Sequence, residues 1–203
     1  MPGTSKLLAL IYKKQRKWDQ ALAQYELALK EKPRAPEIHY GMAVIYWQTG
    51  KHDLADEHFK EAYNLDPVSS KVVISFVEHL REQRKFREAL SYLDSSLLAA
   101  PTNDPVKITR VQTLLDLGEF DTARQSVEAD VAANPNGLEP ILGMAMVKAN
   151  QGDVPAAIQW LEKYELQTSR MVVLRLLTTT SAFDSVRTNQ QFQAYRARLA
   201  LVR

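Results

Sequence analysis

The stretch that decides the fold is APEIHYGMAVIYWQTGKHDLADEHFKEAYNLDP, which runs from Ala35 to Pro67. Apolar residues recur at helical spacing on both sides of Gly50, and a proline closes the stretch, which predicts a helix, a turn and a second helix. The proline returns every 34 residues, at Pro33, Pro67, Pro101 and Pro135. Alanines keep the same spacing, at Ala21, Ala55, Ala89, Ala123 and Ala157. A fixed period of this length predicts a stacked array of helical hairpins.

Small residues at fixed places explain how the two helices of one hairpin approach each other. Antiparallel helices come close only where a side chain is small, so we expect Ala43 and Ala55 to lie between them. Tyr46 and Phe59 would then fill the space beside these alanines. Pro67 stops the second helix, because proline lacks an N–H and disfavours helical geometry in the residue before it.

This order of residues resembles the tetratricopeptide repeat family over roughly residues 2–168. The second repeat carries the resemblance through Ala43, Tyr46, Gly50, Ala55, Phe59, Ala62 and Pro67, and the first through Leu8, Ala9, Tyr12, Trp18, Ala21, Tyr25, Ala28 and Pro33. It implies an all-α, right-handed superhelical solenoid of five helix-turn-helix repeats, at about 2–35, 36–69, 70–103, 104–137 and 138–168. Because no hairpin buries its apolar faces alone, we expect each repeat to depend on its neighbours.

Two residues depart from the repeat pattern. The small position of the second helix, held by Ala28 and Ala62 in the first repeats, is Asp130 in the fourth and Tyr164 in the fifth. A buried carboxylate without a partner is costly, so we expect a local adjustment there.

Residues 169–203 lose the period but keep two helical patterns, at Arg170 to Thr178 and at Gln190 to Val202. The intervening segment around Phe183 resembles a tail common after bacterial tetratricopeptide arrays. A solenoid end exposes the apolar flank of its last helix, so we expect these helices to be a C-terminal cap.

Composition sets broad limits on the function. The 203 residues are 45% hydrophobic and 25% charged, with net charge +2, and no apolar run approaches the roughly 20 residues that span a membrane. Cysteine is absent, so the compartment stays open between cytoplasm and periplasm. Leu7, Leu8, Leu10 and Ile11 form an apolar run with no preceding helix to cover it, which we interpret as a fragment of a longer protein.

Catalysis needs a nucleophile, an acid–base pair or a metal held on a rigid scaffold, and the sequence carries no such set of residues at a convincing spacing. Gly50-Lys51 lacks the Ser or Thr of a phosphate loop, and no zinc or calcium motif is present. His52 stands where other repeats have Trp18, Phe86 or Phe120, so we expect a packed ring there, and His58 falls on an outer helix face. We therefore predict no enzyme, no cofactor and no metal site.

The resemblance also implies which residues line the inner, concave face, since the first helix of each repeat supplies it. From these positions we predict a partner-binding surface of Leu10, Tyr40, Val44, Trp47, Ile74, Glu78, Arg81, Ile108, Gln112, Leu115, Leu142 and Met146. Related repeats that clamp a terminal carboxylate use lysines that Lys6 and Lys71 match. They also need two asparagines and an arginine, where this chain has Leu10, Gly41 and Ser75. We therefore predict a groove for an apolar peptide rather than for a chain terminus. If the register of the repeats were shifted by one residue, several of these side chains would instead pack against neighbouring helices as part of the core.

The resulting hypothesis is a protein-interaction scaffold that binds an apolar or amphipathic peptide segment in its concave groove. Two alternatives stay open: a self-assembling structural subunit that docks through its N-terminal helix, and an accessory domain of a larger enzyme or export machine. Two basic clusters, around Lys13 and around Arg84, are interpreted as a solvated rim, with an acidic partner, anionic lipid or nucleic acid as the alternative. We expect a protein or peptide partner and no nucleic acid, and a homo-oligomer remains open.

Overall fold

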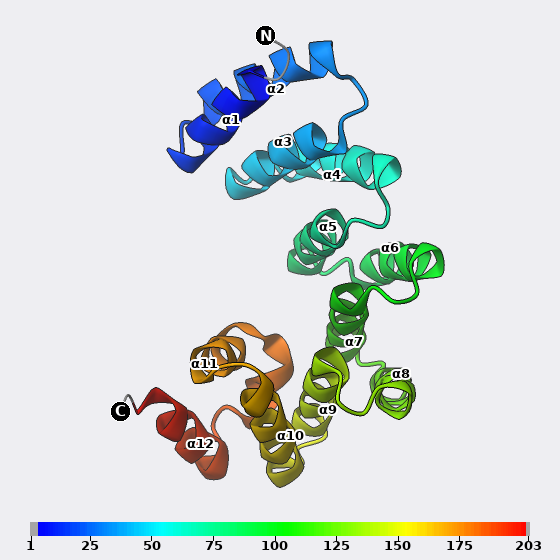
Figure 1. Cartoon of the computed structure of the whole chain (residues 1–203), viewed down its shortest axis with the longest axis vertical. Coiled ribbons are helices and arrows are strands. Elements are labelled where there is room, and N and C mark those ends of the chain that lie inside the picture. Colours follow the sequence, from blue (N-terminus) through cyan, green and yellow to red (C-terminus); the bar gives the residue numbers. More distant parts are fainter. Residues whose placement is uncertain (1–3, 202–203) are drawn as a thin grey trace. The chain divides into compact units, whose positions relative to one another are not determined.

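The computed structural model describes residues 4–201, and within them all regular structure is helical (Figure 1). The elements are α1 (Thr4–Lys14), α2 (Trp18–Glu31), α3 (Pro36–Gln48), α4 (His52–Leu65), α5 (Ser70–Glu82), α6 (Phe86–Ala99), α7 (Asp104–Leu117), α8 (Phe120–Ala133), α9 (Leu138–Asn150), α10 (Val154–Gln167), α11 (Arg170–Thr179), the 3-10 helix η1 (Ser181–Val186) and α12 (Gln190–Ala200). The chain forms two compact units, Met1–Asn103 and Asp104–Arg203.

Each expected repeat forms a pair of contacting helices, from α1 with α2 to α9 with α10. The turn inside every pair contains one residue with a positive φ angle, at Arg16, Gly50, Arg84, Gly118 and Gly152. These positions are 34 residues apart. The left-handed conformation is therefore part of the repeat itself, and glycine fills it in three repeats of five.

The four prolines lie directly after the ends of helices. α2, α4, α6 and α8 stop at C-cap residues Lys32, Asp66, Ala100 and Asn134, each of which immediately precedes one of the prolines. The prolines thus set where the second helix of each repeat ends, as predicted.

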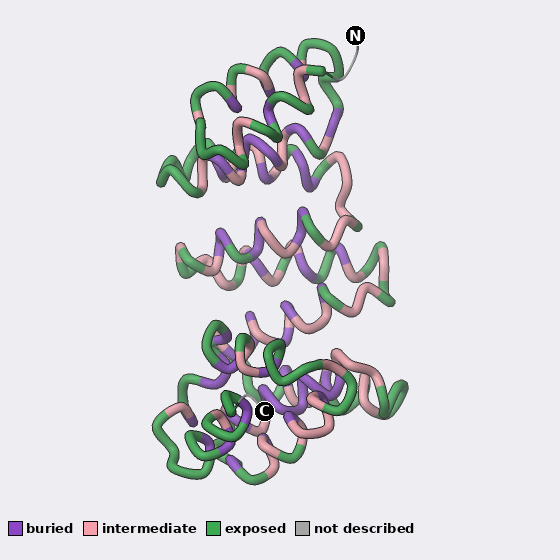
Figure 2. Tube along the Cα trace, turned by 60° about the vertical axis from the view of Figure 1, so that its left-hand side comes forward, coloured by how far each residue is buried: buried purple, intermediate pink, exposed green. Residues whose placement is uncertain are grey.

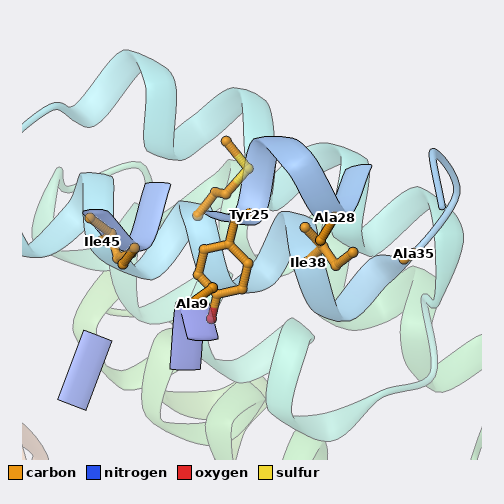
Figure 3. Close-up of a cluster of buried hydrophobic side chains, with 8 residues drawn as sticks. Ala9, Tyr25, Ala28, Ala35, Ile38 and Ile45 are labelled. Atoms are coloured by element: carbon orange, nitrogen blue, oxygen red, sulfur yellow. The ribbon is translucent and has the colours of Figure 1, made fainter. Parts of the chain in front are cut away.

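The alanine series lies in the core. Ala21, Ala55, Ala89, Ala123 and Ala157 are all fully buried. In the first unit, Tyr25 packs in a cluster with Ala9, Ala28, Ile38 and Ile45, which come from three successive helices (Figure 3). Buried and exposed positions alternate along these helices at helical spacing (Figure 2). The small positions are therefore helix contacts.

The two departures from the pattern are accommodated in different ways. The carboxylate of Asp130 lies 2.8 Å from Lys107 Nζ, so its charge is paired. Tyr164 is buried in the fifth repeat. An ion pair replaces the small residue in one repeat and a larger aromatic contact replaces it in the other.

The tail folds as two helices joined by η1. The predicted helix at Arg170 to Thr178 is α11, and the predicted helix at Gln190 to Val202 is α12, which ends at Ala200. Residues 202–203, like residues 2–3 of the expected array, lie outside the described part. Phe183 of η1 and Phe192 of α12 are fully buried, with ring centroids 6.1 Å apart. The tail is thus a packed part of the second unit, and α12 contacts α10.

Candidate partner-binding surface

One face of α3 holds three of the predicted binding residues. Pro36 at the start of α3 fixes where the helix begins. Tyr40, Val44 and Trp47 follow at intervals of four and three residues, which places them on one side of the helix. All three are half-buried, so part of each side chain is open to solvent. We call this set the α3 face.

The Tyr40 side chain is held on several sides. Its hydroxyl lies 3.2 Å from Ser75 Oγ, and its ring meets the buried Phe59 edge-on with centroids 6.3 Å apart. Lys71 Nζ lies 4.5 Å from the ring centroid, and Lys13 Nζ lies 5.9 Å from it. Tyr40 is therefore fixed between α1 and α5.

Trp47 is fixed in a similar way at the other end of the α3 face. Its indole Nε1 donates a hydrogen bond of 2.6 Å to Glu82 Oε2. Its ring contacts Phe59 and His79, at centroid distances of 6.0 and 5.6 Å. Tyr40 and Trp47 thus share one buried aromatic support, and neither ring is free to collapse into the core.

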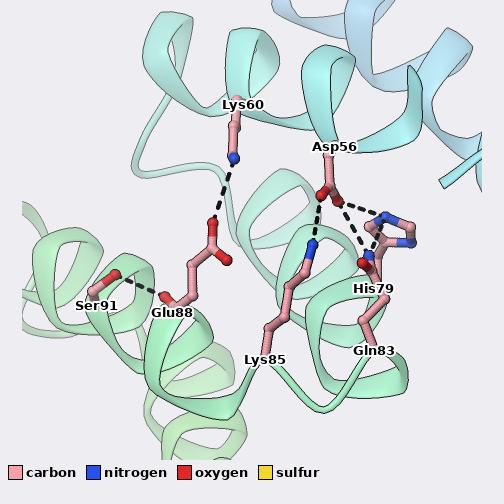
Figure 4. A network of polar contacts seen from close by, with 7 residues as sticks. All are labelled: Asp56, Lys60, His79, Gln83, Lys85, Glu88 and Ser91. Atoms are coloured by element: carbon pink, nitrogen blue, oxygen red, sulfur yellow. Dashed lines mark hydrogen bonds and ion pairs between the residues drawn. The ribbon is translucent and has the colours of Figure 1, made fainter. Parts of the chain in front are cut away.

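A polar network behind Trp47 ties α4 to α5 (Figure 4). Asp56 accepts hydrogen bonds from Lys85 at 2.9 Å and from Gln83 at 3.2 Å, and His79 Nε2 lies 2.8 Å from the same carboxylate. Burial acts to raise the pKa of Asp56, but the hydrogen bonds from Lys85 and Gln83 outweigh it and lower that pKa. Burial lowers the pKa of His79 in spite of the neighbouring Asp56 charge. The network fixes the ring against which Trp47 packs.

The remaining predicted residues of the first unit lie on the helices that flank α3. Leu10 of α1 is 37% exposed, and Ile74 and Arg81 of α5 are half-buried. Glu78 is an exposed residue, but partial burial of its carboxyl raises the pKa of that group. The positive charge of Arg81 acts in the opposite direction and lowers the pKa by less. Because α3 contacts both α1 and α5, these residues flank the α3 face.

The predicted residues of the second unit are in a different environment. Ile108 and Gln112 are half-buried, whereas Leu115, Leu142 and Met146 are buried. The η1 segment contacts both α7 and α9, the helices that carry them. The chain's own tail therefore contacts the helices that form this part of the expected inner face.

Hydrogen bonds hold η1 against these helices. Gln112 Nε2 donates to Ser181 Oγ at 3.3 Å, and Ser181 Oγ donates to Asp116 Oδ1 at 2.9 Å. Ser185 Oγ donates to the backbone carbonyl of Ala149 at 3.0 Å. Gln112, predicted to contact a partner, therefore contacts the tail.

Sequence reasoning missed several contacts of this surface. Glu82 stands at the thirteenth helix position of its repeat, which the family pattern assigns to the inner face, so the signal was present. The burial of His79 had no such signal. His52, expected as a packed ring, stacks on His79 with centroids 5.5 Å apart, and the residue is exposed. The equivalent Phe120 is also exposed, so this repeat position lies at the surface.

Histidines also meet on the other side of α3. His58, expected on an outer face, is half-buried, and its Nδ1 lies 3.1 Å from Nδ1 of His39. Burial and the neighbouring His39 lower the pKa of His58. Within residues 4–201, no three histidine or carboxylate side chains form a group able to hold a metal ion.

The sequence comparisons agree with this architecture. Two tetratricopeptide repeat models match the chain, one over residues 6–70 and the other over residues 80–139. The chain belongs to the tetratricopeptide repeat family. Tetratricopeptide repeats are generally protein-interaction scaffolds rather than catalysts.

This tetratricopeptide repeat protein is similar to known proteins at low sequence identity. It is 24% identical over 120 residues to anaphase-promoting complex subunit 3 of Schizosaccharomyces pombe, a match that covers 59% of this chain and only 18% of that subunit. PilW, a widely conserved type IV pilus biogenesis factor, superposes with a TM-score of 0.66 at 23% identity, over 98% of this chain and 91% of PilW. YrrB, a TPR protein with an unusual peptide-binding site, gives a TM-score of 0.55 at 19% identity, over 84% of this chain and 88% of YrrB.

The part of the chain that the structure describes contains no helix with the length and apolar character needed to cross a membrane.

Proposed function

We propose that this tetratricopeptide repeat protein is an interaction scaffold that binds an apolar or amphipathic peptide segment on the face formed by α1, α3 and α5. The observation that carries the proposal is the α3 face. Tyr40 and Trp47 are partly open to solvent, yet both are held by hydrogen bonds and by Phe59. Large aromatic side chains that are already ordered lose little entropy on binding, so they suit the role of binding hot spots.

The contacts of η1 with α7 and α9 support limiting the proposed partner surface to the first unit. Leu115, Leu142 and Met146 are buried on helices that η1 contacts, whereas the described residues of the first unit leave the α3 face half-buried. We therefore assign Leu10, Tyr40, Val44, Trp47, Ile74, Glu78 and Arg81 to the partner surface. The peptide-binding site described for YrrB is consistent with this use of the fold. The proposal includes no catalytic step.

A displayed library of 16-residue peptides with apolar residues at helical spacing tests the proposal. Peptides selected on the whole chain are synthesised and titrated by calorimetry. Trp47→Ala should weaken binding by about 2 kcal/mol, roughly thirtyfold. Trp160→Ala is the matched control, because Trp160 is a half-buried tryptophan of α10, in the other unit, with a lysine over its ring.

A second variant separates binding from folding. Trp47→Ala also removes contacts to Phe59 and Glu82, so its thermal melt must be compared with that of wild type. Val44→Glu places a charge on the same face without removing an aromatic support, and it should abolish binding of the same peptides. Unchanged affinity in both variants would refute the assignment of this face.

Self-association is a second candidate function, favoured by the exposure of α1. Leu7 is 63% exposed and Ile11 is 49% exposed, which is unusual for neighbouring large aliphatic residues. A sedimentation-velocity series would show a concentration-dependent dimer, and Ile11→Glu would abolish it. A monomer at all concentrations would exclude this function for the chain.

A further inference from the structure

α1 carries an apolar side that its neighbours leave open to solvent. Leu7 and Ile11 are 63% and 49% exposed, and Leu8 and Leu10 are each 37% exposed. Ala9 is buried on the opposite side of the helix. Residues four apart share one side of a helix, so Leu7 and Ile11 project together away from Ala9. α1 packs against α2 and α3, and these contacts leave the side of Leu7 and Ile11 open.

Basic side chains continue this apolar side of α1. From Thr4 to Lys17 every charged residue is a lysine or an arginine. Lys14 follows Ile11 by three residues and lies on the same side of α1, and Arg16 and Lys17 follow in the turn before α2. All three are exposed, and within residues 4–201 none of them forms an ion pair. Exposed aliphatic side chains therefore stand next to uncompensated positive charge. We call this set the α1 edge: Leu7, Ile11, Lys14, Arg16 and Lys17.

Two other places in the first unit have one of these features without the other. Leu98 of α6 is 85% exposed, but the acidic Asp94 lies one helical turn before it. Arg84 stands in the turn of the third repeat, but the residue of α5 at the repeat position of Ile11 is the buried His79. The α1 edge differs from both places because aliphatic and basic side chains are exposed together.

The surface of an anionic membrane fits both features. Aliphatic side chains enter the boundary between headgroups and acyl chains, and neighbouring cations are attracted to acidic headgroups. Stable binding to a membrane surface takes two such contributions, since either one alone is weak. A second copy of the chain would bring an equally positive α1 against this one, so charge opposes that contact. Nucleic acid would attract the cations but leave Leu7 and Ile11 in water.

We propose that the α1 edge binds the surface of a membrane that contains anionic lipid, with its two aliphatic side chains inserted below the headgroups and its three basic side chains against the acidic headgroups. α1 then lies along the membrane surface and does not cross it. The residues of the α1 edge are separate from those assigned to the peptide partner. This inference therefore goes beyond the proposed function and does not depend on it.

Co-sedimentation of the whole chain with lipid vesicles tests this inference. Vesicles of phosphatidylcholine with about 30% phosphatidylserine are compared with vesicles of phosphatidylcholine alone. At about 50 mM salt the wild type should bind the anionic vesicles roughly tenfold more tightly, and this advantage should shrink at about 0.5 M salt. Lys14→Gln/Arg16→Gln should lose most of the advantage. Ile11→Gln should weaken binding to the anionic vesicles severalfold, because less apolar surface is inserted.

Matched controls place the same kinds of change away from the α1 edge. Arg84→Gln/Arg87→Gln removes two exposed cations from the third repeat, and Leu98→Gln removes an exposed leucine from α6. Both should bind the anionic vesicles as tightly as wild type does. Thermal melts of all variants check that the fold is kept, as expected for changes at exposed positions.

The inference would be overturned by equal binding to both kinds of vesicle, or by no binding to anionic vesicles at either salt concentration. It would also be wrong if Lys14→Gln/Arg16→Gln bound as wild type does, or if the control variants lost as much binding. A concentration-dependent dimer that does not bind vesicles would assign the α1 edge to self-association. Trp47→Ala should bind vesicles as wild type does, so a failure of the peptide proposal and a failure of this one are distinguishable.

Discussion

Gly41 of α3 lies directly against the ring of Tyr25 from α2: a methyl group on Gly41 would come within 2.5 Å of Tyr25 Cζ. Tyr25 is 1% exposed and is packed among Ala9, Ala28 and Ile38, so its ring cannot move aside without opening the core. Because Gly41 has no side chain, the first two repeats can approach each other this closely.

This contact predicts that Gly41→Ala destabilises the protein. Helix propensity alone favours alanine by about 1 kcal/mol, but overpacking a filled core costs roughly 1–3 kcal/mol. We expect a lower free energy of unfolding in urea. Combining it with Tyr25→Leu should recover part of the loss, which a double-mutant cycle measures. A more stable Gly41→Ala protein would show that the ring can shift.

The turn of the first repeat predicts a stabilising change. Arg16 has a φ angle of 56°, at the position that glycine fills in the second, fourth and fifth repeats. Left-handed geometry costs an ordinary L-residue about 1 kcal/mol, so Arg16→Gly should raise the free energy of unfolding by about that amount. Gln15→Gly, one residue earlier, is the control and should give no gain. Equal effects of the two changes on the thermal melt would contradict this reasoning.

The packing of η1 predicts that Phe183 supports the second unit. Its side chain is fully buried, so Phe183→Ala should cost about 3–5 kcal/mol and expose apolar surface of α9. The matched control is Phe120→Ala in the same unit, where the ring is 50% exposed. Urea denaturation with light scattering reports both stability and aggregation. Similar losses at the two positions would mean that η1 is not a structural cover.

Buried histidines predict a pH dependence of stability. The pKa of His58 is lowered by burial and by His39, and the pKa of His79 is lowered by burial. In the unfolded chain these groups titrate near 6.5. The unfolded state therefore binds more protons below that pH, and the folded state should lose stability as pH falls from 7.5 to 5.5.

Histidine variants assign this effect. His58→Gln should reduce the loss of unfolding free energy between pH 7.5 and 5.5, since one of the shifted groups is gone. His79→Gln should reduce the loss as well, because burial also lowers the pKa of His79. Identical pH profiles for wild type and His58→Gln would disprove a role of His58 in this dependence.

The sequence by itself determined the helices, their ends and the repeat. Pro33 and Ala55 each act through contacts within one hairpin or with the next one, and such contacts recur every 34 residues, so they leave a periodic signal. The tertiary structure showed that Arg16 and Arg84 adopt the left-handed turn; the signal for it in the sequence is their place at the repeat position of Gly50, and not their own side chains.

Part of the candidate site could likewise be predicted from the sequence, and part could not. Tyr40, Val44 and Trp47 were predictable from helix position, because the spacing of residues along a helix fixes which of them share a face. The covering of α7 and α9 by η1 was not predictable, since Ser181 meets Asp116 across 65 residues that follow no repeat. The gathering of Lys13 and Lys71 at Tyr40 likewise depends on the angles between α1, α3 and α5. Side-chain packing sets those angles, and a one-dimensional pattern does not record them.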